Sequence, residues 1–202
     1  MKIILNFTLV VLTAMVLAGC LRDGHHIDAA NLSQGEPVFS EVRDSSPAEK
    51  GKIDVVVRLS LKTPLEGYYL FESKKSRRGK TDYPLVINVD GQTALWREDG
   101  KRETTPKYGP DGVRLPEGGD GMRYVFERRV RVSPGNHQIR VELPEERRSR
   151  TVELNLQERN EPYLLELKPI YSRSMKSRPC FLHGVSRLNA YLNGVRLENK
   201  DS

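Results

Sequence analysis

The feature that most constrains the fold is a stretch near position 53 in which every second residue is apolar. In "IDVVVRLSL", residues 53–61, each odd position is Ile, Val or Leu. Successive side chains of an extended strand point to opposite faces, so these apolar residues share one face that can be buried. A helix would scatter them around its surface. The stretch therefore predicts a half-buried β-strand.

The same alternation returns further along the chain. It runs through "MRYVFERRVRV" at 122–132, with Arg128 as the one exception, and then through 139–143, 152–156 and 163–167. No window shows helical spacing of comparable strength. Several short strands are thus expected, and strands of this kind need turns between them.

Turn sequences stand where the strand patterns stop. Asp90-Gly91 and Asn193-Gly194 each lie between apolar residues, and such pairs favour two-residue hairpins because both turn positions need positive φ. Pro134-Gly135 also favours a tight turn, and residues 145–150 read as a polar connection. The pattern predicts an all-β chain, folded as an antiparallel β-sandwich or barrel.

One internal segment breaks the strand pattern. Residues 97–121, "REDGKRETTPKYGPDGVRLPEGGDG", are rich in Gly and Pro and have no apolar period. Long segments of this kind inside a compact domain are usually functional loops or disordered ones. We expect a long loop at 97–121.

The N-terminus has the layout of an export signal. Met1-Lys2 gives a short positive start, and an apolar stretch over 3–16 leads into the small residues Ala18-Gly19. The stretch is shorter than the roughly 20 residues that span a bilayer comfortably. Residues 1–19 are therefore predicted to form a signal helix.

Leu17-Ala18-Gly19-Cys20 resembles the bacterial lipobox, where a peptidase cuts before a cysteine whose thiol carries diacylglycerol. The resemblance implies that Cys20 is the first mature residue and the lipid attachment site. Leu21 in place of an aspartate favours the outer membrane, facing the periplasm. Two or more acyl chains would hold the protein stably, whereas one would not. The alternative is an ordinary signal that ends near a cysteine.

The mature chain divides into a tether and a domain. Residues 20–51 are rich in Asp, Glu, Ser, Gly and Ala and lack apolar periodicity, so they predict a flexible tether with a typical reach of roughly 30 Å. Residues 52–200 carry the strand patterns and predict one β-sandwich domain.

Two motifs within residues 84–168 resemble a known family. Val89-Asp90-Gly91 ends a strand, and a later "PGNHQI" at 134–139 starts another. This pair is similar to the PEGA domain and to related immunoglobulin-like or transthyretin-like modules of bacterial surface proteins. The resemblance implies a sandwich of that kind with a non-catalytic binding or scaffold role.

No pattern in the chain indicates catalysis, a metal or a cofactor. The histidines stand at 25, 26, 137 and 183. His25-His26 lie with Asp23 and Asp28 in the predicted tether, where no framework fixes the geometry that a metal demands, and adventitious metal binding is the alternative there. His137 is expected to be a satisfied core histidine. No Gly-x-Ser-x-Gly turn or phosphate-binding loop occurs. We therefore expect a protein that is not an enzyme and has no cofactor.

Cys180 would have no partner within the chain if Cys20 is acylated. Phe181 and Leu182 beside it favour a buried thiol that packs as a small apolar group. A free thiol that forms an intermolecular disulfide, and hence a homodimer, is the alternative.

Basic runs are the remaining candidate binding feature. They predict binding of anionic lipid, lipopolysaccharide or acidic glycan at close range, while the alternative is a solvated surface that protects strand edges. The first run is Lys74, Lys75, Arg77, Arg78 and Lys80, and the second is Arg147, Arg148 and Arg150. We take the residues of these two runs as candidate anion-binding residues. A third run comprises Arg173, Lys176 and Arg178.

Together these features predict a lipid-anchored protein of the cell envelope. Its membrane partner would be engaged through acylated Cys20, and its domain would act as a scaffold for an envelope protein. The alternative function is recognition of an anionic ligand through the basic loops. Nucleic acid is not expected as a partner, because the chain is exported and its net charge of +6 is modest for 202 residues.

Overall fold

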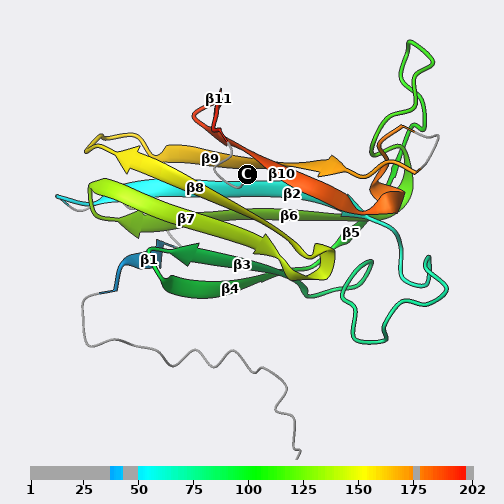
Figure 1. Cartoon of the computed structure of the whole chain (residues 1–202), viewed down its shortest axis with the longest axis horizontal. Coiled ribbons are helices and arrows are strands. Elements are labelled where there is room, and N and C mark those ends of the chain that lie inside the picture. Colours follow the sequence, from blue (N-terminus) through cyan, green and yellow to red (C-terminus); the bar gives the residue numbers. More distant parts are fainter. Residues whose placement is uncertain (1–36, 43–49, 175–177, 199–202) are drawn as a thin grey trace, which may run out of the picture. The chain divides into compact units, whose positions relative to one another are not determined.

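A computed structural model describes residues 37–42, 50–174 and 178–198 (Figure 1). The predicted signal peptide and Leu17-Ala18-Gly19-Cys20, the predicted lipid attachment motif, lie outside these residues. The described chain is all-β, with two single-turn 3₁₀ helices, η1 (Pro144–Glu146) and η2 (Phe181–His183). Its strands are β1 (Phe39–Val42), β2 (Ile53–Thr63), β3 (Tyr83–Val89), β4 (Gln92–Glu98), β5 (Lys101–Thr105), β6 (Gly119–Val132), β7 (Gly135–Leu143), β8 (Arg148–Leu156), β9 (Tyr163–Tyr171), β10 (Val185–Leu192) and β11 (Val195–Arg196).

These strands form two sheets that pack as a sandwich. The larger sheet has the order β1-β6-β2-β9-β10-β11, with β5 also paired to β6, and the smaller has the order β4-β3-β7-β8. The predicted β-sandwich is confirmed. One pairing differs from the antiparallel expectation, because β2 and β9 run parallel, with Val55 opposite Tyr163.

The alternating residues of β2 supply the centre of the core, as predicted. Its odd positions from Ile53 to Leu61 have no exposed surface. The strand pairs with β6 in one unbroken antiparallel register from Ile53↔Val132 to Thr63↔Met122. The rings of Tyr83 in β3 and Tyr124 in β6 lie 4.4 Å apart and join the two sheets. Full burial of a valine, leucine, isoleucine or phenylalanine side chain in this core stabilises the fold by about 1.5–3 kcal/mol.

Both predicted two-residue turns are present. Asp90 and Gly91 have φ values of 48° and 94° and connect β3 to β4, and Asn193 and Gly194 have values of 48° and 84° between β10 and β11. Positive φ at both positions is the mark of a type I′ hairpin, whose twist matches that of the strands.

Three segments differ from their predicted structure. Residues 39–42, expected in the tether, form β1 because Phe39 is buried in the core and pairs with Val132 of β6. The expected loop at 97–121 contains β5, whose polar residues pair with the N-terminal half of β6. The expected polar connection at 145–150 is shorter, since β8 begins at Arg148.

Candidate functional site

The most elaborate surface feature of the described chain is the connection between β2 and β3, residues 64–82, which we call the β2–β3 loop (Figure 1). It is folded as a succession of tight turns. In each turn a backbone N–H bonds to the carbonyl three residues earlier, as from Tyr68 to Leu65 at 3.2 Å and from Ser76 to Ser73 at 2.9 Å. The loop is therefore an ordered structure with its own hydrogen bonds.

Gly79 closes the base of the β2–β3 loop. Its N–H donates to Thr63 Oγ1 at 3.1 Å, and its φ is +72°. A Cβ at this position would lie 2.3 Å from the backbone nitrogen of Glu66, so the two ends of the loop can approach only at a glycine. Tyr124 of β6 fixes the same base by donating to the carbonyl of Lys80 at 2.6 Å.

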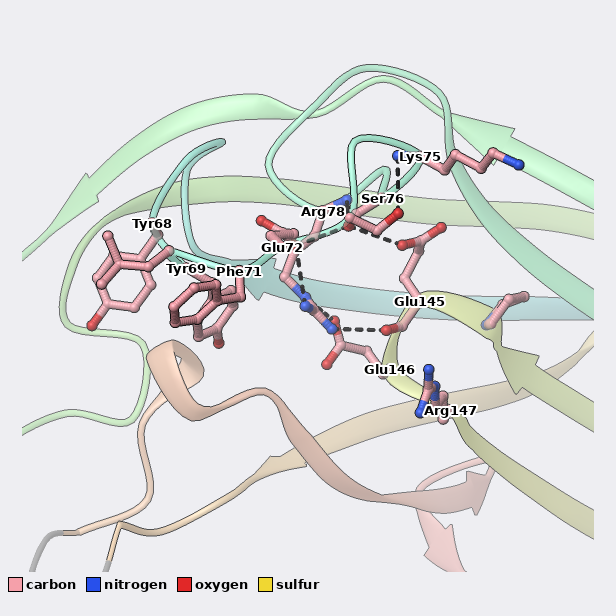
Figure 2. Close-up of a pocket in the computed structure, with 13 residues that line it drawn as sticks. Tyr68, Tyr69, Phe71, Glu72, Lys75, Ser76, Arg78, Glu145, Glu146 and Arg147 are labelled. Atoms are coloured by element: carbon pink, nitrogen blue, oxygen red, sulfur yellow. Dashed lines mark hydrogen bonds and ion pairs between the residues drawn. The ribbon is translucent and has the colours of Figure 1, made fainter.

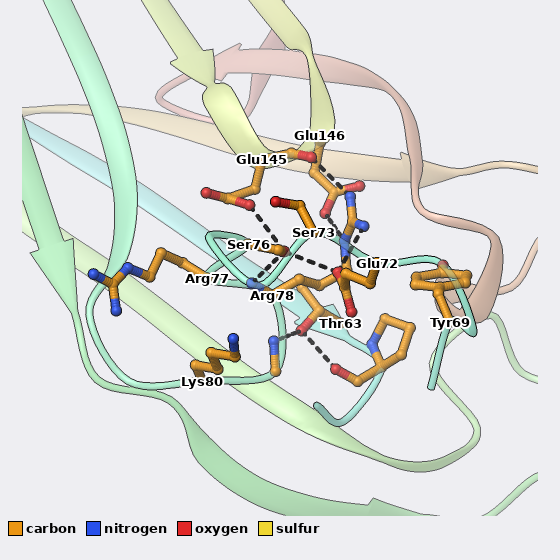
Figure 3. Close-up of polar contacts among 12 residues, drawn as sticks. Thr63, Tyr69, Glu72, Ser73, Ser76, Arg77, Arg78, Lys80, Glu145 and Glu146 are labelled. Carbon is orange, nitrogen blue, oxygen red and sulfur yellow. Dashed lines mark hydrogen bonds and ion pairs between the residues drawn. The ribbon is translucent and has the colours of Figure 1, made fainter. Parts of the chain in front are cut away.

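Arg78 holds the loop against the η1 turn. Its guanidinium donates from Nε to Glu146 Oε1 at 2.9 Å, from Nη1 to Glu72 Oε1 at 3.2 Å and from Nη2 to the carbonyl of Glu145 at 2.7 Å (Figure 3). Ser76 Oγ reinforces the contact, with Glu72 at 2.8 Å and Glu145 at 3.1 Å. Figure 3 shows that Arg77 points away from this cluster.

Glu146 is the buried anion at the centre of the cluster, with 3% of its side chain exposed. It also accepts from Tyr83 OH at 3.3 Å and from the backbone N–H of Val185 at 3.1 Å. Burial works to lower the pKa of Arg78, but the hydrogen bond and charge of Glu146 outweigh it and raise that pKa. Burial and then the charge of Glu146 raise the pKa of Tyr83.

Beyond this braced base, the loop presents an apolar tip. Leu70 is 92% exposed and Phe71 is 98% exposed, while Tyr68 is half exposed. Tyr69 behind them is held in place, because its hydroxyl donates to the carbonyl of Leu182 at 2.7 Å. The loop and the η1 turn border an open groove of about 990 Å³, with the aromatic side chains on one side and Arg147 on the other (Figure 2).

The structure brings part of the two predicted basic runs together at this groove. Lys74, Lys75 and Arg77 are exposed on the loop, and Lys75 and Arg147 both line the groove although the chain separates them by 72 positions (147 − 75). Lys80 is partly buried and pairs with Glu66 at 3.3 Å. One end of the sandwich thus gathers exposed cations beside an apolar tip.

Two of the predicted anion-binding arginines are instead engaged within the chain. Arg78 donates to Glu146, Glu72 and the carbonyl of Glu145, as described above. Buried Arg150 donates from Nη2 to the carbonyls of Leu197 and Glu198 at 3.0 and 2.6 Å. Exposed Arg148 donates to the carbonyl of Val185 at 3.1 Å. Oxygens of the chain thus accept from all three nitrogens of Arg78 and from Nη2 of Arg150, while the buried Nε of Arg150 has no hydrogen-bond partner among the described residues. Anion binding by these two arginines stays a prediction.

The third basic run lies elsewhere. Arg173 and Arg178 are exposed near η2, and Lys176 lies outside the described residues. Cys180 is buried, with Arg114 Nη2 at 3.7 Å from its Sγ, whereas His183 is exposed. The thiol therefore packs as the buried apolar group that its neighbours in the sequence favoured.

His137 is the satisfied core histidine that the sequence predicted. Its Nδ1 lies 2.6 Å from Asp90 Oδ2 and its Nε2 lies 2.7 Å from the carbonyl of Ser133. Asp90 also accepts from the backbone N–H of Gln138 at 2.7 Å. The side chain links the β3–β4 turn to the start of β7.

A second polar cluster, around Lys62, gave no sequence signal. Its buried ammonium donates to Thr105 Oγ1 at 3.0 Å and to the carbonyls of Glu117 and Gly119 at 3.1 and 2.6 Å. Burial lowers the pKa of Lys62. The donors of this lysine hold the end of β5 and the start of β6 against β2, which is a structural task.

Among the residues that the structure describes, no three His, Cys, Asp or Glu side chains are grouped so that they could hold a metal ion. Within the same residues, no helix has the length and apolar character needed to cross a membrane. Comparison with protein-family models, with curated proteins and with solved structures finds no match for this chain.

Proposed function

We propose that this chain is a lipid-anchored protein of the bacterial cell envelope whose β-sandwich serves as a non-catalytic binding or scaffold module. The observation that carries the proposal is Leu17-Ala18-Gly19-Cys20 at the end of an apolar run with a positive start. The position of the cysteine, the small residues before it and the run upstream all fit the lipobox pattern. Acylated Cys20 would place the domain at a membrane, with the outer membrane favoured by Leu21.

The geometry of the sandwich supports a display role. The chain enters at β1, where Phe39 lies opposite Val132, and the β2–β3 loop leaves from Thr63, which lies opposite Met122 at the far end of β6. The 11 residues of β2 separate these ends by about 36 Å. Figure 1 shows β1 and the loop at opposite ends of the sandwich. A module attached through β1 would therefore present the loop at the end remote from its attachment.

The polar clusters of the described chain support a scaffold more than a catalyst. Glu146, His137 and Lys62 are each buried and each hydrogen-bonded to fixed partners within the chain. A catalytic acid, base or nucleophile needs an open side where a substrate can approach. These three groups instead join strands and turns to one another.

A second candidate function is recognition of an anionic ligand, and a specific observation favours it. Lys74, Lys75 and Arg147 lie around one groove or beside it, with their side chains free to meet solvent. Retention on a lipopolysaccharide or glycan resin that weakens with added salt would support this candidate. Salt-insensitive co-purification of a single envelope protein would support the scaffold instead.

The anchoring proposal is tested by labelling growing bacteria with radioactive palmitate. We expect label in the wild-type protein, no label in Cys20→Ala, and release of the Cys20→Ala protein from the membrane fraction. Cys180→Ala is the matched control, because it removes the other cysteine and should keep both label and membrane attachment. Label-free wild-type protein, or Cys20→Ala that stays on the membrane, would contradict the proposal.

A further inference from the structure

We infer that the tip of the β2–β3 loop docks on an anionic phospholipid bilayer. Leu70 and Phe71 would enter the interfacial region of the bilayer, and Lys74 and Lys75 would meet the phosphate groups above it. The inference rests on the proposed function, because it names the surface that the displayed end of the anchored module contacts.

Two large apolar side chains are exposed next to each other at the tip of the loop. Leu70 and Phe71 are 92% and 98% exposed, so almost none of their surface is covered by the described chain. Single exposed apolar residues are ordinary on protein surfaces, but here two adjoin and half-exposed Tyr68 lies two residues before them. Leucine and aromatic side chains are the residues that membrane-surface proteins bury in the interface.

The fold of the loop pairs its carboxylates but leaves some of its cations exposed and, within the described residues, unpaired. Its three carboxylates each have a cationic partner. Glu72 is turned inward to Arg78 with 13% of its side chain exposed, Glu66 pairs with Lys80, and Asp82 pairs with Arg97. Lys74, Lys75 and Arg77 stay exposed, and among the described residues no salt bridge engages them. The face beside the apolar tip is therefore cationic, which complements anionic head groups.

The loop is also held in shape before it meets any surface. Its tight turns order the loop itself. The Arg78–Glu146 pair and the hydrogen bond from Tyr69 to the carbonyl of Leu182 fix it to the η1 and η2 turns of the sandwich. A tip that is already ordered loses little conformational entropy on docking.

The chain is long enough for one bilayer to receive both the anchor and the tip. From Cys20 to Phe39 there are 19 peptide units (39 − 20), which span at most about 65 Å. This exceeds the length of β2, about 36 Å, that separates β1 from the loop. The domain can therefore lie along the membrane with its far end touching it.

The test places a fluorescent reporter at the tip. The full-length protein carrying Phe71→Trp, purified from membranes, is reconstituted in vesicles of phosphatidylcholine with phosphatidylglycerol, with and without brominated acyl chains. Trp96 is the one tryptophan of the natural chain and is buried, so the wild-type protein gives the background. We expect the Phe71→Trp signal to shift to the blue and to be quenched by bromine several-fold more than the background. In pure phosphatidylcholine, and in Lys74→Ser/Lys75→Ser, the quenching should fall several-fold.

A second tryptophan position serves as a control for quenching that arises merely because the whole domain lies near the lipid. Val195→Trp places the reporter at another exposed apolar position, 69% exposed in β11, and its emission should stay unquenched. Equal quenching at both positions would overturn the inference. So would an unquenched Phe71→Trp signal in anionic vesicles. A blue shift without bromine quenching would also overturn it, because it would show the tip covered by protein, such as a second copy of this chain, and not by lipid.

The failure of this inference can be told from the failure of anchoring. If the protein carries lipid and floats with the vesicles while Phe71→Trp stays unquenched, the anchor holds and the docking inference is wrong. If the purified protein lacks lipid, the anchoring proposal fails, and vesicles added to the same protein still report on the tip alone.

Discussion

Arg78 donates a 2.9 Å hydrogen bond from Nε to Oε1 of Glu146, across 68 positions of the chain. The two side chains are 18% and 3% exposed, so the pair is largely removed from water. It joins the β2–β3 loop to the η1 turn between β7 and β8. The position of the apolar tip thus depends on a contact that lies behind it.

Loss of this pair should be costly. Arg78→Met would leave the Glu146 carboxylate buried beside Tyr83 without its cation, and removal of one partner of a buried pair typically costs about 3–5 kcal/mol. We expect the free energy of unfolding in urea to fall by about 3 kcal/mol. Arg77→Met, at the exposed neighbouring position, should change it by less than about 0.5 kcal/mol. Equal effects of the two substitutions would show that the pair does not brace the loop.

The close approach of the backbone at Gly79 predicts that alanine costs more stability at Gly79 than at Gly67. Gly79→Ala places a Cβ against the backbone of 64–66 and keeps a positive φ, whereas Gly67→Ala meets only the φ of +79° in open space. Gly67→Ala should cost about 1 kcal/mol. Gly79→Ala should cost about 2 kcal/mol more, because its backbone neighbours must move. Thermal unfolding of both variants tests this, and similar midpoints would contradict the tight closure.

Lys62 should matter for the strands that it ties together. Lys62→Met keeps most of the side-chain volume but leaves the carbonyls of Glu117 and Gly119 without this donor. We expect a loss of about 2 kcal/mol, together with faster hydrogen exchange in β5 and the following residues to 119. Lys101→Met, at an exposed position of β5, is the control. Unchanged exchange in Lys62→Met would mean that the ammonium does not hold this region.

A pH dependence follows from Glu103. Its hydrogen bond with Arg123, Nε to Oε2 at 2.7 Å, holds the pKa of the Glu103 carboxyl below its usual value. A carboxyl with a lowered folded-state pKa adds stability above its unfolded pKa of about 4.5 and loses it as the pH falls through the folded value. Because a third of the side chain is exposed, the effect should stay under about 1 kcal/mol.

Glu103→Gln should therefore be less stable than the wild type near neutral pH, and the difference should vanish in acid. Urea unfolding at a series of pH values from about 7 to about 3 measures it. A difference that stays constant over that range would show that the carboxylate charge contributes nothing.

The sequence predicted the parts of the fold that depend on local chemistry. The alternation in 53–61 is local and predicted a strand with one buried face, and Asp90-Gly91 predicted its turn because few residues accept positive φ. The sequence did not predict strands β1 and β5, because their polar residues are stabilised by pairing with β6, a partner distant in the sequence. The parallel pairing of β2 with β9 has no local signal either.

The candidate site divides in the same way. The sequence located the basic run, but it could not separate Arg77 from Arg78, which have the same charge and adjacent positions. Arg78 is engaged because the fold of the loop turns Glu72 to it and the turn after β7 brings Glu146 and the carbonyl of Glu145 to it. The exposure of Leu70 and Phe71 could not be predicted from the sequence either, since an apolar pair within a chain usually predicts burial.

We propose that Cys20 carries the lipid that anchors this module, and the intact mass of the protein purified from membranes tests this at the residue itself. We expect a chain that begins at Cys20, with the added mass of a diacylglycerol group and of any further acyl chain. An unmodified mass, or a chain that begins at another residue, would contradict it and would make Leu17-Ala18-Gly19 the end of an ordinary export signal.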